Sequence, residues 1–193
     1  MRYHNITKAD MLNGDGLRVV LRVSGCSHCC KGCQNPITWD PEGGLLFDEE
    51  AKNEIFEQLE LPYISGITFS GGDPLHPANS TCVRELVDEI REKYPDKTIW
   101  LYTGSSWEEI CRLPLIAKLD VVVDGEFIEE QKDVKLLWKG SANQRVIDVQ
   151  KTLAGDDPEI PVLHCADYYD GQTWPTPQVC PLESHDDINS CHA

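Results

Sequence analysis

The sequence predicts an α/β protein built around a parallel sheet, and three observations lead to that prediction. Short β-branched segments alternate with amphipathic ones, which is the pattern of βαβ units. Each of these β-branched segments runs into a loop of small residues. The chain has 193 residues, 40% hydrophobic and 26% charged, which is enough for one globular core. About four to six parallel strands are too few to close an eight-stranded barrel, so we expect a partial (β/α) barrel.

Four segments are predicted to be strands, because they are apolar, β-branched and end at small or polar turn residues. They cover residues 18–23, 66–70, 98–102 and 121–123. The loops that follow them cover residues 24–26, 70–72, 103–104 and 124–125. Right-handed crossovers bring the carboxyl ends of parallel strands to one edge of the sheet. We therefore expect all four loops to lie together on the functional face.

Helices are predicted between these strands. Asp48 is a suitable N-cap for a helix that extends to Leu59 with its apolar residues on one stripe. The clearest helix covers residues 80–94, and a proline ends it. Ser106 and Glu109 have the spacing of a capping box at the start of a third, short helix.

The C-terminal part of the chain has a different composition. Residues 152–193 contain eight acidic residues and no Lys or Arg, and five of the twelve prolines also lie there. A segment with this composition and little periodicity buries too little apolar surface to fold as a second domain. We therefore expect a domain at 1–153 and an acidic, loop-rich or partly disordered extension at 154–193.

The composition also limits which cellular compartment and which kinds of partner we expect. The net charge is -16, from 17 Lys and Arg against 33 Asp and Glu, and such a surface repels the phosphates of nucleic acids. No run of 18 apolar residues predicts a membrane span, and residues 1–10 have no apolar stretch typical of a signal peptide. We expect a cytoplasmic protein. In that reducing compartment, nine cysteines indicate metal ligation or catalysis rather than disulfides.

Four of the cysteines lie within eight residues, directly after the first predicted strand. Cys26, Cys30 and Cys33 have the spacing C-x3-C-x2-C, whereas Cys26, Cys29 and Cys33 give C-x2-C-x3-C. Thiolates this close in sequence can converge on a soft metal centre. A structural zinc site usually requires four ligands in two separated pairs, and no C-x-x-C occurs outside this cluster. A set of three thiolates would leave one corner of a cubane cluster open to a small molecule.

The C-x3-C-x2-C spacing at the end of a first strand resembles the signature of the radical S-adenosylmethionine (SAM) superfamily. Other segments follow in a fixed order: NGDGLR at 13–18, GCQN at 32–35, TW at 38–39, SGGDPL at 70–75, IWLYTG at 99–104, VDGEF at 123–127 and LWKGSANQR at 137–145. Together they resemble the activating protein of anaerobic ribonucleoside-triphosphate reductase over about residues 1–147. The last of these segments is far more specific than the cysteine motif.

This resemblance implies a partial barrel of the radical SAM type, with a [4Fe–4S] cluster on Cys26, Cys30 and Cys33. It also implies reductive cleavage of SAM to a 5′-deoxyadenosyl radical, which takes a hydrogen atom from a glycine of the large reductase subunit. An electron donor such as flavodoxin would supply the electron. No catalytic residue is expected beyond the cluster and SAM, because the cofactors carry the chemistry.

The expected contacts with SAM lie on two loops. Gly71 and Gly72 allow the backbone to approach a ligand closely, because no Cβ intrudes. Asp73 is expected either to add charge there or only to form a turn with the proline that follows it. The resemblance implies further contacts with the adenine from Gly32 and Gln34, although the family usually has an aromatic residue in place of Gln34.

Several roles stay open at this stage. The family usually has a Lys where Glu126 stands, and Cys29 is an extra thiol inside the motif. We expect His28 to face solvent, and the turn at 124–125 to be either structural or a ligand contact. Residues 143–145 either meet a partner or cap the fold. Cys165, Cys180 and Cys191 are candidates for a second metal site.

Two other functions compete with this hypothesis. The chain could activate another glycyl radical enzyme, such as one of the formate lyase type, although the segment at 143–145 and the short chain disfavour this. From a different class, it could be a zinc-binding interaction module without catalysis, which metal analysis would reveal.

Overall fold

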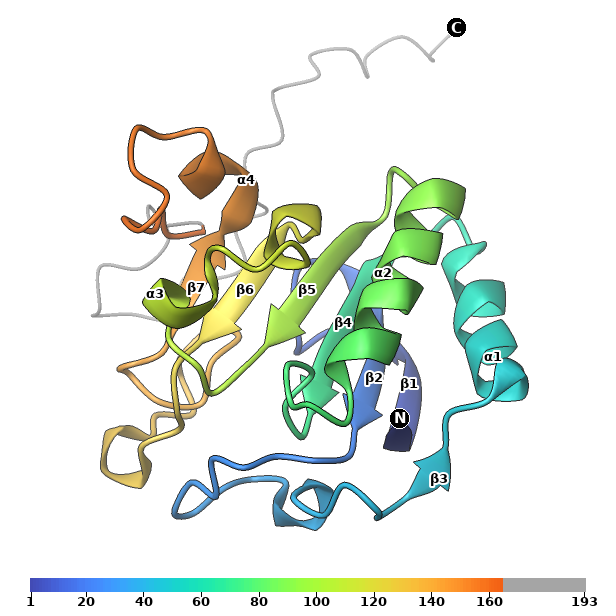
Figure 1. Cartoon of the computed structure of the whole chain (residues 1–193), viewed down its shortest axis with the longest axis horizontal. Helices are drawn as coiled ribbons and strands as arrows, with labels where there is room; N and C mark the ends of the chain where they lie inside the picture. The colour runs from blue at the N-terminus through green and yellow to red at the C-terminus, as the bar shows by residue number, and fades with distance from the viewer. Residues whose placement is uncertain (165–193) are drawn as a thin grey trace, which may run out of the picture.

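The computed structural model describes residues 1–164, which form one mixed sheet flanked by helices (Figure 1). The seven strands have the order β3-β1-β2-β4-β5-β6-β7. The four central strands are parallel, and they are β2 (Leu17–Val23), β4 (Ile64–Gly71), β5 (Thr98–Tyr102) and β6 (Val121–Asp124). The four predicted strands are thus confirmed, and the α/β class with them.

The edges of the sheet differ from the prediction, because their strands are antiparallel. On one side β1 (Arg2–Asp10) pairs with β2, and the two-residue β3 (Leu45–Leu46) pairs with β1. On the other side β7 (Arg145–Asp148) pairs with β6. The prediction of a parallel sheet is therefore confirmed for the four central strands and wrong at both edges, whereas the partial-barrel shape stays a prediction.

The predicted helices are confirmed together with their caps. In α1 (Glu49–Leu59) the side chain of Asp48 accepts a hydrogen bond from the backbone N–H of Ala51. In α3 (Trp107–Ile110) both hydrogen bonds of the capping box form between Ser106 and Glu109. The remaining helices are α2 (Ser80–Lys93) and α4 (Val149–Leu153), with short 3-10 turns at Pro36–Thr38, Ile116–Lys118 and Glu129–Gln131.

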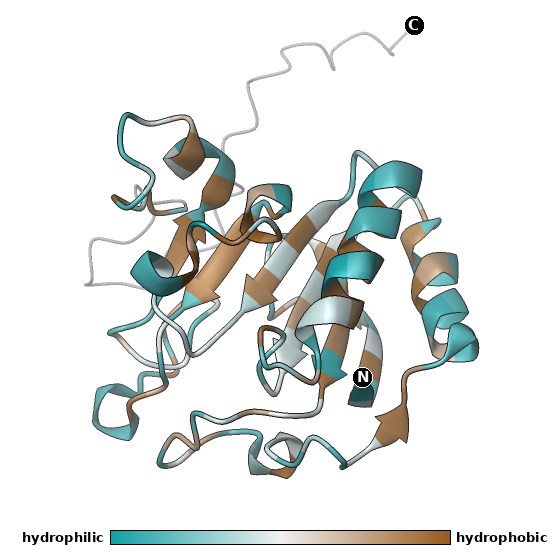
Figure 2. Cartoon of the chain, in the orientation of Figure 1, coloured by the Kyte–Doolittle hydropathy of each residue, from teal (hydrophilic) through white to brown (hydrophobic). Residues whose placement is uncertain are grey.

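The main core lies between the sheet and the helices α1 and α2, which cover one of its faces (Figure 1). In Figure 2 brown is concentrated on the strands, above all on β6 and β7, whereas the outer face of α2 is largely teal. The apolar stripe predicted in α2 is fully buried here, and so are the alternate residues of the strands. These are Val83, Leu86, Val87 and Ile90 of α2, and Val19, Leu21, Ile67, Phe69, Ile99 and Leu101 of the sheet.

The opposite face of the sheet buries a charged residue near the start of β2. Arg18 is fully buried and donates to the hydroxyls of Thr68 and Thr98 and to three backbone carbonyls. Its guanidinium also lies 5.2 Å from the centre of the Trp100 ring. Burial lowers the pKa of Arg18 to about 10, but the many acceptors satisfy its donors. This arginine therefore fills the amino-terminal end of that face.

The first residues of the C-terminal extension return to the edge of the sheet. The backbone of His164 donates to the carbonyl of Val146 in β7, and Asp148 donates to the carbonyl of Val162. The ring of His164 lies 5.2 Å from Trp100 and 5.6 Å from Trp138, measured between ring centres. The domain boundary at 153 stays a prediction, and the candidate ligands Cys165, Cys180 and Cys191 lie outside the described residues. No helix within residues 1–164 is long and apolar enough to cross a membrane.

Candidate functional site

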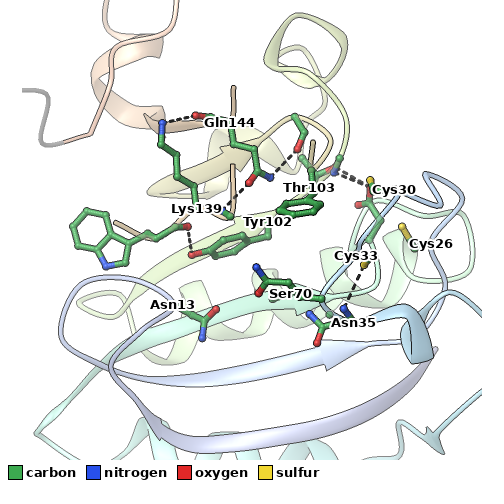
Figure 3. Close-up of a pocket in the computed structure, with 18 of the residues that line it drawn as sticks. Asn13, Cys26, Cys30, Cys33, Asn35, Ser70, Tyr102, Thr103, Lys139 and Gln144 are labelled. Carbon is green, nitrogen blue, oxygen red and sulfur yellow. Dashed lines mark hydrogen bonds between the residues drawn. The ribbon is translucent and has the colours of Figure 1, made fainter. Parts of the chain in front are cut away.

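A cavity of about 600 Å³ lies at the carboxyl ends of the parallel strands (Figure 3). This volume falls within the usual range of small-molecule sites. The loops after β2, β4, β5 and β6 all contribute lining residues, which confirms that they share one face. The segment 134–140 supplies another wall.

Three cysteines of the loop after β2 line this cavity. Cys26, Cys30 and Cys33 are half-buried and gather on one side of it in Figure 3, whereas Cys29 is exposed and is not part of the lining. The backbone at Cys29 has a φ of 50°, in the left-handed region that non-glycine residues seldom adopt. This geometry favours the set Cys26, Cys30 and Cys33 over the set with Cys29.

The three sulfur-bearing side chains border the cavity. Burial raises the pKa of Cys26 and Cys30, and a metal cation bound to the sulfur would favour the thiolate over the thiol. The backbone N–H of Asn35 points at the sulfur of Cys33, 3.3 Å away. Within residues 1–164, no three His, Cys, Asp or Glu side chains are grouped to hold a single metal ion. A cubane cluster makes a different demand, because each thiolate binds its own iron atom.

Two glycines at the end of β4 bring the loop that follows it against the cysteine loop. The backbone of Gly72 donates to Val23, and that of Asp73 donates to Gly25, both over 2.8 Å. A Cβ at Gly72 would lie 2.5 Å from the carbonyl oxygen of Gly25. Gly71 has a φ of 99°, and a Cβ there would lie 2.7 Å from the Cα of Arg22. Both glycines line the cavity, but the close approach that they permit here is to the protein's own backbone.

Asp73 is buried, and protein donors surround its carboxylate. Its Oδ1 accepts from the backbone of Leu75, as expected for a turn. Its Oδ2 accepts from the hydroxyl of Thr103, 2.9 Å away, and from the N–H of Gly104, and it lies 2.7 Å from Nε2 of His28. Asp73 lines the cavity, and its carboxylate joins the loops after β2, β4 and β5.

His28 does not face solvent, so that expectation is wrong. Its side chain is 19% exposed, and its ring lies between Asp73 and Glu126, with Nδ1 at 3.0 Å from the carboxylate of Glu126. The ring also packs on Gly104, where a Cβ would lie 2.5 Å from it. The hydrogen bond to Asp73 is the main cause that raises the pKa of His28 to about 9. Its partners are 45 and 98 residues away in sequence, so local patterns gave no signal for this contact.

Because His28 lies between the carboxylates of Asp73 and Glu126, we expect the stability of the protein to depend on pH. The pKa of His28 is about 9 in the folded protein and about 6.5 when unfolded, so its contribution is present below the lower value and is lost as the pH rises through the higher one. From about pH 6 to about pH 10, the iron-free wild type should lose about 1–3 kcal/mol of unfolding free energy relative to His28→Gln. Urea unfolding at both values measures this. An equal loss in both proteins would contradict it.

The two remaining predicted contacts occupy different places. Gln34 is exposed and belongs to the cavity lining. Gly32 does not belong to it, and a Cβ at this position would lie 2.7 Å from the side chain of Glu129. The contact of both residues with adenine stays a prediction.

The segment 137–145 holds the end of β6. Gln144 accepts from the backbone of Gly140 and donates to the carbonyl of Gly125, and Asn143 donates to the carbonyl of Glu126. Trp138, Lys139, Gly140 and Gln144 of this segment line the cavity. Sequence reasoning left a partner contact or a capping role open for 143–145, and these bonds show capping.

The turn after β6 is structural at its first residue. Asp124 is buried, and its carboxylate accepts from the backbone of Trp107 over 2.7 Å and pairs with Arg145. Arg145 also pairs with Glu108 over 2.9 Å, and these bonds lower the pKa of Glu108 to about 2. The carboxylate of Asp124 therefore anchors α3 and β7 to the strand end.

Comparison with protein families gives a match to a 4Fe-4S single cluster domain over residues 12–147. Three anaerobic ribonucleoside-triphosphate reductase-activating proteins are similar to the chain. That of Enterobacteria phage T4 is 42% identical over 146 residues, 76% of this chain and 93% of that protein. That of Vibrio cholerae is 45% identical over 148 residues, 75% of this chain and 96% of its own. That of Escherichia coli K12 is 41% identical over 150 residues, which cover 76% of this chain and 97% of that protein.

Proposed function

Because the chain belongs to the family of anaerobic ribonucleoside-triphosphate reductase-activating proteins, we propose that it activates such a reductase in the cytoplasm by radical SAM chemistry. The observation that supports this proposal best is the placement of Cys26, Cys30 and Cys33 on one wall of a cavity that the strand ends enclose. The expected product is a glycyl radical on the large reductase subunit. A one-electron donor such as flavodoxin completes the system.

The residues of the cavity fit a [4Fe–4S] cluster. The three thiols are half-buried and border the same space, and one sulfur already accepts a backbone N–H, which stabilises thiolate charge. Cys26, Cys30 and Cys33 would hold the cluster and leave its fourth corner to SAM. The chemistry that such a cluster would supply is one-electron reduction of SAM, which would lead to removal of a hydrogen atom from a glycine of the reductase.

The protein's own residues position this chemistry. The bonds of Asp73 and His28 fix the cysteine loop against the ends of β4, β5 and β6. Gly71, Gly72 and Gln34 line the same cavity as the three cysteines, and we assign SAM to the space beside them. The segment 134–140 supplies a further part of the cavity lining.

The test is SAM cleavage by the protein after anaerobic reconstitution with iron and sulfide. With a strong reductant, we expect 5′-deoxyadenosine in amounts that depend on the protein, and a glycyl radical signal by electron paramagnetic resonance when the reductase is added. A glycyl radical enzyme of the formate lyase type serves as the control partner, and no radical should form on it. Zinc in place of iron, or no product with or without the reductase, would contradict the proposal.

A further inference from the structure

Arg22 is a cation in the cavity that has no acidic partner among residues 1–164. It lies in β2, is half-buried and belongs to the cavity lining. Its side chain makes one hydrogen bond in this part of the chain, from Nη1 to the hydroxyl of Thr7 over 2.9 Å. A guanidinium has five N–H donors in a planar fork, so most of its capacity is unused.

The other charged residues of the cavity are already engaged. Asp73 is the one carboxylate of the lining, and His28, Thr103 and Gly104 contact it. The ammonium of Lys139 donates to the carbonyls of Ala142 and Gln144. The cavity of a chain with a net charge of -16 thus contains an unpaired positive group and no free carboxylate within the described residues. Within residues 1–164, the guanidinium of Arg22 is therefore the charged group of the lining that remains able to bind a carboxylate.

The position of Arg22 relates this group to the proposed cofactors. Arg22 pairs with Ser70 in the register between β2 and β4, and it lies four residues before Cys26. Its Cα is the atom closest to the missing Cβ of Gly71. Arg22 therefore lies near the end of β2, close both to the cysteine loop that follows this strand and to Gly71 of the adjacent strand.

We propose that Arg22 binds a carboxylate group inside the cavity, an inference that rests on the proposed function. A guanidinium and a carboxylate can form two parallel, charge-assisted hydrogen bonds, which a lysine cannot reproduce. Two sources can supply the carboxylate: the methionyl end of SAM, or an acidic side chain or chain terminus of the reductase segment that enters the cavity.

The experiment compares the reconstituted wild type with Arg22→Gln, Arg22→Lys and the control Arg84→Gln, whose arginine is exposed on α2 outside the cavity. Equilibrium dialysis measures the affinity for SAM and for decarboxylated SAM, and the reductase titration gives its KM in radical formation. Iron content and melting temperature verify that each variant folds.

A SAM carboxylate predicts that Arg22→Gln weakens SAM about tenfold or more and leaves decarboxylated SAM unchanged, with a smaller loss in Arg22→Lys. A reductase carboxylate predicts unchanged SAM affinity and a KM for the reductase raised by about tenfold or more. Either result supports the inference. If the wild type binds SAM and Arg22→Gln changes neither the affinity for SAM nor the KM for the reductase, the inference is wrong and the proposed function stands. The same holds if Arg22→Gln weakens the binding of SAM and of decarboxylated SAM equally. If the wild type neither binds SAM nor forms a radical, the proposed function fails and this inference with it.

Discussion

Cys30→Ala should lose its cluster and all SAM cleavage, whereas Cys29→Ala should retain both. Cys30 lines the cavity together with Cys26 and Cys33, and removal of one of three thiolates leaves an iron atom without its protein ligand. Cys29 is exposed and is not part of this lining, so we expect its loss to remove no ligand. Iron and sulfide analysis with the visible absorption spectrum measures the cluster, and 5′-deoxyadenosine measures cleavage.

The control for this pair uses the backbone at residue 29. Cys29→Gly removes the thiol and relieves the positive φ, which costs non-glycine residues about 1 kcal/mol. We expect it to bind iron as the wild type does and to unfold at an equal or slightly higher temperature. If Cys29→Ala loses iron and Cys30→Ala keeps it, the ligands are Cys26, Cys29 and Cys33 instead.

Gly71→Ala should destabilise the protein by about 3–5 kcal/mol, because two costs combine at this position. Its φ of 99° excludes most side chains, and the new Cβ would lie 2.7 Å from the backbone of the adjacent strand. Backbone atoms cannot move aside as a flexible side chain can, so the ends of β2 and β4 must separate. We expect a melting temperature lower by about 10 °C or more and a loss of SAM binding.

Gly125→Ala is the matched control for this effect. Gly125 has a similar φ of 92°, but the nearest atom to its missing Cβ is 3.8 Å away. It should therefore cost only about 1–2 kcal/mol, from backbone strain alone. Equal melting temperatures for the two variants would show that the close approach of β2 and β4 adds nothing to the cost.

The parallel core of this fold could be predicted because its signals are local. A buried strand such as β5 is apolar throughout its middle, and the caps of α1 and α3 lie three residues from their partners. The edge strands carry no such signal. The nine residues of β1 are largely polar and only partly shielded from solvent, so they show no apolar run. The strand β3 has two residues, which is too short for any pattern.

In the candidate site, too, some features have a local signal in the sequence and others do not. The spacing of the cysteines predicts a metal centre, but the choice between Cys29 and Cys30 depends on a backbone angle that only the folded loop defines. The contacts of His28 with two carboxylates, and the lack of an acidic partner for Arg22 within residues 1–164, depend on residues from distant segments. Pairings between distant segments are tertiary properties, so a single sequence shows the residue types without their partners.

The contacts of His164 bear on how a shortened version of this protein should be cut. The matched family domain ends at residue 147, but the ring of His164 packs on Trp100 and Trp138, and its Nε2 lies 2.7 Å from Asp15. The hydroxyl of Tyr102 donates a hydrogen bond to the carbonyl of Trp138, and both residues line the cavity. A truncation at the family boundary would therefore strip a supporting layer from behind the cavity wall, and an expression clone should keep every residue up to 164.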